Sequence, residues 1–77
     1  MAVTVRLFAA AREAAGTDRL AVPAGPVRAG LLALGLGERF EQVLAVCTVV
    51  SDGYRLGPDD AVEEDAVVDV LPPFAGG

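Results

Sequence analysis

The sequence predicts one small α+β domain in which a helix packs on one face of a mixed β-sheet. Three observations support this prediction: an alternating strand near the start, an apolar helical repeat in the middle, and valine-rich segments in the second half. With 77 residues, the chain is long enough for a single domain with a modest core. The apolar fraction of 53% indicates that this domain is folded.

The first quarter of the chain predicts two strands joined by a short helix. Residues 3–8 alternate with period two, and the expected inner face carries Val3, Val5 and Leu7. Residues 9–15 are rich in helix formers, and Gly16 is placed to end that helix. Residues 19–22 form the second expected strand. The tight link favours antiparallel pairing of this strand with the first.

The middle of the chain predicts the main helix. Residues 23–26 read as a loop, and Pro26 suits the first turn of a helix. The apolar face that follows has helical spacing and consists of Val27, Leu31 and Leu34. Residues 35–37 end this helix, and residues 40–44 are expected to form a further helical turn.

The second half predicts three strands separated by turns. The apolar run 44–50 suits a strand that is buried on both faces. A short edge strand is expected at 54–56 and the last strand at 66–71, with Asp69 facing water. Turns are expected at 51–53 and 57–60, and two prolines at 72–73 stop the last strand. This order of elements favours a β-grasp fold.

Composition excludes several classes of function. The net charge is −5, with 11 acidic residues, six arginines and neither lysine nor histidine. Such a chain is unsuited to nucleic acid, and its partners are expected to present basic surfaces. A single cysteine and no histidine argue against a metal site. No apolar run is long enough to cross a membrane and residues 1–6 lack the layout of a signal peptide, so the cytoplasm is the expected location.

The C-terminal residues carry the predicted chemistry. The chain is expected to divide into a domain at residues 1–72 and a flexible tail at 73–77. This tail consists of Pro73, Phe74, Ala75, Gly76 and Gly77. Its small residues leave the backbone thin enough to enter a narrow channel in a partner. Activation of the Gly77 carboxylate as an acyl-adenylate, followed by sulfur transfer, would produce a nucleophilic thiocarboxylate.

Other residues have structural as well as functional interpretations. Cys47 is read as a small hydrophobic residue of the apolar strand rather than a sulfur relay. The acids at 59–65 are read as a solvated rim rather than a metal site. Phe8, as an exposed strand residue, belongs either to an apolar docking patch or to a secondary core.

Three stretches resemble the small subunit of molybdopterin synthase, a member of the ubiquitin-like sulfur-carrier family. These stretches are residues 7–16, residues 63–70 and the end Leu-Pro-Pro-Phe-Ala-Gly-Gly at 71–77. The resemblance implies a β-grasp fold and a subunit that is not catalytic alone. It also implies adenylation of Gly77 by a ubiquitin-activating-type enzyme, which uses ATP and magnesium. The thiocarboxylate would then donate sulfur inside the large catalytic subunit of a heterotetramer.

Four functional hypotheses remain open at this stage. The first is a sulfur carrier in molybdenum cofactor biosynthesis. The second is a carrier of the same chemistry for thiamine, cysteine or tRNA thiolation. The third is a ubiquitin-like modifier of other proteins, and the fourth is a binding module with an inert tail. In the first three, Gly77 supplies the reacting group, while Phe8 and residues 73–76 are expected to contact partners.

Overall fold

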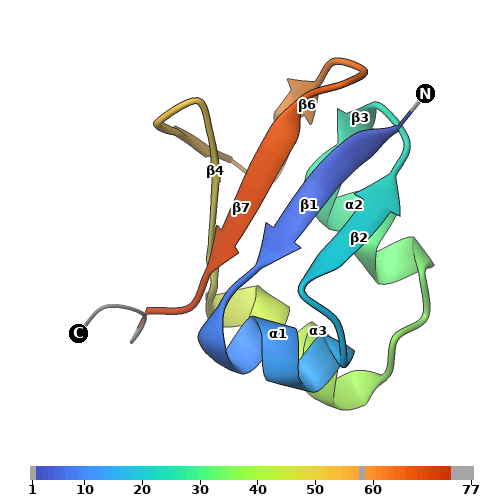
Figure 1. Cartoon of the computed structure of the whole chain (residues 1–77), viewed down its shortest axis with the longest axis vertical. Helices are drawn as coiled ribbons and strands as arrows, with labels where there is room; N and C mark the ends of the chain where they lie inside the picture. The colour runs from blue at the N-terminus through green and yellow to red at the C-terminus, as the bar shows by residue number, and fades with distance from the viewer. Residues whose placement is uncertain (1, 58, 74–77) are drawn as a thin grey trace.

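A five-stranded mixed sheet forms the centre of the fold (Figure 1). The computed structural model describes residues 2–57 and 59–73. In spatial order the strands are β2 (Arg19–Val22), β1 (Val3–Leu7), β7 (Val67–Leu71), β4 (Thr48–Ser51) and β5 (Tyr54–Leu56). The neighbours β1 and β7 are parallel, and the other pairs are antiparallel. The antiparallel pairing expected for the first two strands is confirmed.

Within residues 2–57 and 59–73, three helices accompany this sheet, near the positions where the sequence predicts a short helix, the main helix and a further helical turn. They are α1 (Ala9–Ala15), α2 (Val27–Ala33) and α3 (Glu38–Val46). Figure 1 shows α2 behind β1 and β2, and α1 at the end of the sheet beside α3. The fold class is confirmed as an α+β, β-grasp arrangement. In the part of the chain that the structure describes, no helix is long and apolar enough to span a membrane.

The core lies between the inner face of the sheet and the helices. The alternation in β1 is confirmed, because Val3, Val5 and Leu7 are buried whereas Arg6 is exposed. The other buried core residues are Ala11, Val22, Val27, Leu31, Phe40, Leu44, Cys47, Val49, Val68 and Val70. Complete burial of a Leu, Val or Phe side chain contributes about 1.5–3 kcal/mol, so these residues supply most of the favourable free energy of folding.

Two glycines allow close or unusual backbone geometry. Gly16 ends α1 in the left-handed region at φ 78°, and its N–H donates to the carbonyl of Arg12, as the sequence predicts. Gly30 lies inside α2, where an added Cβ would stand 3.1 Å from the Cβ of Val22. The missing side chain therefore allows α2 to approach β2 closely.

The strand expected at 44–50 is wrong at its start, because α3 continues to Val46 and β4 begins only at Thr48. Phe40 and Leu44 are buried one helical turn apart, so this segment follows the helical period. Cys47 consequently lies at the C-cap of α3, not within a strand. β4 also differs from expectation in its burial, since only Val49 is fully buried.

The segment around Pro26 also differs from its prediction as a loop and first helical turn. Gly25–Pro26 forms β3, which pairs antiparallel with β6 (Ala61–Val62) in a second, two-stranded sheet. Pro26 is the N-cap of α2, one residue before the helix begins. Leu34 is 41% exposed at the other end, although its spacing predicts burial. The helix ends at Ala33, so Leu34 leaves the inward face.

Candidate functional site

The end of β7 determines where the C-terminal segment leaves the domain. β7 is a central strand, held by β1 through Leu7↔Val70 and by β4 through Thr48↔Leu71. Pro72 is buried and Pro73 is exposed. The described chain therefore reaches the surface directly after a strand that is anchored on both sides. Phe74, Ala75, Gly76 and Gly77 lie outside the described residues, and their roles remain predictions.

Phe8 lies close to this exit but is not a strand residue, contrary to its expected place. It is the N-cap of α1, immediately after β1, in an extended backbone conformation. Its side chain is 38% exposed, and the guanidinium carbon of Arg6 lies 6.0 Å from the ring centroid. This distance is at the limit for a cation–π contact, so the arginine supports the orientation of the ring weakly. Partner binding by Phe8 remains a prediction.

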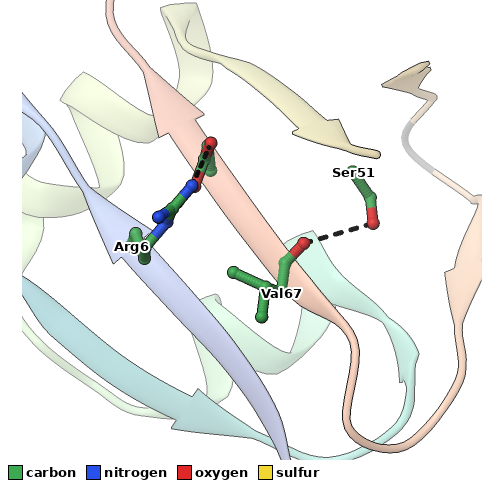
Figure 2. A network of polar contacts seen from close by, with 4 residues as sticks. Arg6, Ser51 and Val67 are labelled. Carbon is green, nitrogen blue, oxygen red and sulfur yellow. Dashed lines mark hydrogen bonds and ion pairs between the residues drawn. The ribbon is translucent and has the colours of Figure 1, made fainter. Parts of the chain in front are cut away.

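Arg6 and Asp69 form a two-point ion pair across the parallel strands β1 and β7. Nε of Arg6 donates to Oδ1 of Asp69 at 2.6 Å, and Nη2 donates to Oδ2 at 2.9 Å. Figure 2 shows Arg6 reaching from β1 over β7 on the sheet face opposite the core. The hydrogen bond and charge of Asp69 raise the pKa of Arg6. Asp69 lies on the outer face as expected, where it partners this arginine.

A second polar contact ties β4 to the start of β7. The hydroxyl of Ser51 donates to the carbonyl of Val67 at 3.3 Å (Figure 2). Together with the ladder between β4 and β7, this bond holds the origin of the last strand. Both ends of β7 are thus fixed in the sheet before the chain reaches Pro73.

Two pockets lie beside Phe8, and sequence reasoning identified neither of them. One has a volume of about 470 Å³ and is lined by Ala9, Arg12, Glu13, Gly16, Thr17 and Asp18. The other has about 200 Å³ and is lined by Arg6, Leu7, Phe8, Arg12, Asp18 and Arg19. The three arginines of the second pocket come from β1, α1 and β2. Counting the register of the first two strands would have placed Arg6 opposite Arg19, so the signal was present in the sequence.

The remaining candidate residues take structural positions. Cys47 is only 4% exposed, and burial raises the pKa of its thiol, opposed by the charge of Arg28. A neutral buried thiol is a poor nucleophile, which supports its interpretation as a small hydrophobic residue. Acids at 59–60 and 63–65 are exposed. Within residues 2–57 and 59–73, no group of three or more cysteine, aspartate or glutamate side chains is arranged to hold a metal ion.

The fold and the anchored exit at Pro73 define a small ubiquitin-like protein of the β-grasp class. The sequence model of the ThiS family matches residues 5–77, so the chain belongs to the ThiS family. That match includes the described site and the last residue, Gly77. A search of curated protein sequences finds no match to the chain.

Solved structures with the same fold come from archaea and bacteria. SAMP1 from Haloferax volcanii superposes with a TM-score of 0.78 at 24% identity, with full coverage of both chains. A chain from the complex of subunits 1 and 2 of the molybdopterin-converting factor of Helicobacter pylori gives 0.67 at 23%, also with full coverage. A putative subunit 1 of that factor from Pyrococcus furiosus gives 0.68 at 25%, covering 95% of this chain and 98% of its own.

Proposed function

We propose that this protein is a sulfur carrier whose Gly77 carboxylate is converted to a thiocarboxylate for molybdopterin biosynthesis. The observation that carries the proposal is the match to the ThiS family, which continues to Gly77 at the end of the chain. The Gly76–Gly77 sequence supports the same conclusion, because neither residue has a side chain that would prevent close approach of an enzyme.

The proposed chemistry has two steps at one carbon atom. A carboxylate oxygen of Gly77 attacks the α-phosphorus of ATP, which forms the acyl-adenylate and releases pyrophosphate. A hydrosulfide equivalent then adds to the acyl carbon, expels AMP and loses its proton, leaving the thiocarboxylate. ATP and magnesium belong to the activating enzyme, which is proposed to be of the ubiquitin-activating type. The sulfur of the product is a soft nucleophile, as a thiolate is.

The described structure suits this role because it gives the tail a fixed origin. β7 is anchored by β1 and β4, and Pro72 is buried immediately after it. A partner that binds the folded surface would therefore find the tail starting at a defined point. Holding a reacting group close to its target in this way reduces the entropy lost on reaching the transition state.

The proposed partner for sulfur delivery is the large subunit of molybdopterin synthase, with which the chain would form a heterotetramer. Support comes from the likeness to a chain of the molybdopterin-converting factor complex of H. pylori. Thiamine, cysteine or tRNA thiolation is the alternative destination, because a ThiS-family carrier with this tail suits each acceptor. Co-purification from native cells distinguishes them: recovery of the large subunit supports the first destination, and recovery of another sulfur-accepting enzyme contradicts it.

Two tail variants test the proposed mechanism. Deletion of Gly77, or the change Gly76→Phe, should abolish sulfur transfer to the acceptor while the circular dichroism spectrum stays unchanged. Deletion of Gly77 shortens the tail, so that its terminal carboxylate no longer reaches the site where it is activated. Gly76→Phe adds a bulky side chain to the thin tail. Arg39→Gln is a suitable control, since Arg39 is an exposed residue of α3. Full activity in either tail variant would contradict the mechanism.

A second candidate function is covalent modification of other proteins. This candidate is supported by the likeness to small archaeal modifier protein 1 from Methanosarcina acetivorans, which has a TM-score of 0.70 and 24% identity. The chain contains no lysine, so it could be attached to targets but could not form lysine-linked chains of itself. Proteomic detection of Gly77 joined to target lysines in cells would support this candidate, and its absence under active expression would oppose it.

A further inference from the structure

Three of the five strands carry an arginine on the outer face of the sheet: β2, β1 and β5. The register places Arg6 opposite Arg19 on β2 and beside Asp69 on β7. Asp69 in turn pairs with Val50, which lies opposite Arg55 on β5. Like charges directly opposite each other on antiparallel strands are destabilising. The neighbouring pair Arg6 and Arg19 therefore opposes stability, and an anion bound between them would remove that repulsion.

The pocket of about 200 Å³ brings two of these arginines, Arg6 and Arg19, together with Arg12 of α1. Its lining contains Arg6, Arg12 and Arg19 but only one acid, Asp18. Arg6 has the carboxylate of Asp69 as its partner. Within residues 2–57 and 59–73, Arg12 and Arg19 make no ion pair closer than 4.0 Å, and both are exposed. Two guanidinium groups in this pocket are thus available to an external anion.

The acidity of the whole chain does not cancel this local charge. Five of its 11 acids lie at positions 59–65, in the connection that leads to β7. This connection meets the start of β1, where the N–H of Thr4 donates to the carbonyl of Ala66. The pocket lies at the other end of β1, roughly 13 Å away at 3.3 Å per residue. That distance exceeds the screening length of about 8 Å at physiological ionic strength.

We propose that this pocket, defined by Arg6, Arg12 and Arg19, binds an acidic segment of a partner protein through its carboxylates. Guanidinium groups bind carboxylates in a two-point geometry, which Arg6 already shows with Asp69. The exposed ring of Phe8 lines the same pocket and offers apolar contact to the backbone of such a segment. The net charge predicts basic partners, whereas this part of the surface selects an acidic one.

The inference deepens the proposed function and rests on it in one respect: the acidic segment would belong to a protein that acts on Gly77. The pocket adjoins the tail exit, because Leu7, which lines it, pairs with Val70 near the end of β7. If an acidic segment bound in this pocket, the partner protein that carries it would lie against the surface next to Pro73, where the tail begins. Binding at the pocket and chemistry at Gly77 are separate events and fail independently.

Titration by heteronuclear NMR tests the inference on the full-length protein. The probe is a short capped peptide of alternating glutamate and glycine, compared with the same peptide carrying glutamine and with inorganic phosphate. We expect saturable shifts at the amides of Arg6, Phe8, Asp18 and Arg19 with the glutamate peptide. We expect no such shifts with the glutamine peptide, and only weaker binding of phosphate.

Matched variants identify the charges responsible. The double variant R12Q/R19Q should weaken binding of the glutamate peptide by about tenfold or more, because two charge-assisted contacts are lost. R39Q, at an exposed position of α3 outside the pocket, should change the affinity less than about twofold. The spectrum of each variant reports whether the fold is intact.

Three results would overturn the inference. These are shifts confined to another surface, equal binding of the glutamine peptide, and saturation by phosphate without saturation by the glutamate peptide. The third result would mark a site for free anions instead of a protein segment. The NMR titration contains no activating enzyme, so a failure of the peptide to bind would not contradict the proposed chemistry at Gly77. A failed mass test of Gly77 with successful peptide binding would reject the proposed function alone.

Discussion

Replacement of Arg28 by methionine tests how the junction between α3 and β4 is held. Nη1 of Arg28 donates to the carbonyl of Leu44 at 2.8 Å, and Nη2 donates to the carbonyl of Cys47 at 2.5 Å. Both bonds are partly buried, and they reach carbonyls at the C-terminal end of α3 and at its C-cap, where the regular helical donors run out. Methionine retains much of the apolar stem but removes both donors.

The expected destabilisation follows from these contacts. A hydrogen bond from a charged donor contributes about 1.5–3 kcal/mol. The Leu44 carbonyl also accepts from the N–H of Cys47, so it keeps one partner, whereas the Cys47 carbonyl loses its charged donor. We therefore expect Arg28→Met to lower the free energy of unfolding by about 2–4 kcal/mol. This is a large part of the roughly 4–12 kcal/mol typical of a 77-residue domain.

Urea unfolding followed by circular dichroism measures this change, with an unchanged dependence on urea concentration showing that the unfolding reaction is the same. Arg39→Met is the matched control. Nη2 of Arg39 lies 3.9 Å from Oε1 of Glu13, and both side chains are more than 70% exposed. Its loss should change stability by less than about 0.5 kcal/mol. Equal effects of the two substitutions would refute the role assigned to Arg28.

Three further predictions concern the core and its thiol. Phe40→Ala should lower the free energy of unfolding by about 3–5 kcal/mol, because Phe40 is 1% exposed and its removal leaves a cavity; a loss below about 1 kcal/mol in urea unfolding would contradict this packing. Cys47 should react with a thiol-specific disulfide reagent much more slowly in the native protein than in urea, and equal rates would show that it is accessible. Burial raises the pKa of this thiol in the folded state, while the unfolded thiol ionises near pH 8.5. Its contribution to stability should therefore be complete below about pH 8.5 and be lost as the pH rises through the folded pKa, a decline that Cys47→Ala should lack.

Local sequence signals predicted the parts of the fold that depend on short-range geometry. The alternation in residues 3–7 placed Val3, Val5 and Leu7 in the core, and Gly16 ends α1 as expected. The boundary near residue 46 was not predictable in this way, since an apolar run suits a buried strand and a helix equally. Burial of Phe40 and Leu44 and the capping bonds from Arg28 decide it, and these contacts form only in the folded domain.

The candidate site also has one part that local sequence predicts and another that depends on the folded structure. The role of the tail could be predicted from residues 71–77, because its proposed chemistry needs only small residues and a terminal carboxylate. The pair Arg6 and Asp69 is separated by 63 positions and depends on the parallel register of β1 and β7. No local pattern encodes that register. The arginine pocket additionally needs α1 to bring Arg12 beside the two strands.

The mass of the intact protein tests the central claim most directly. The full-length chain is incubated with its activating enzyme, magnesium, ATP and a sulfide source, and is then measured by mass spectrometry with fragmentation of the C-terminus. The account predicts a mass increase equal to exchange of one oxygen for sulfur, located on Gly77 and dependent on ATP. An unchanged mass, with an activating enzyme that forms the adenylate, would contradict it.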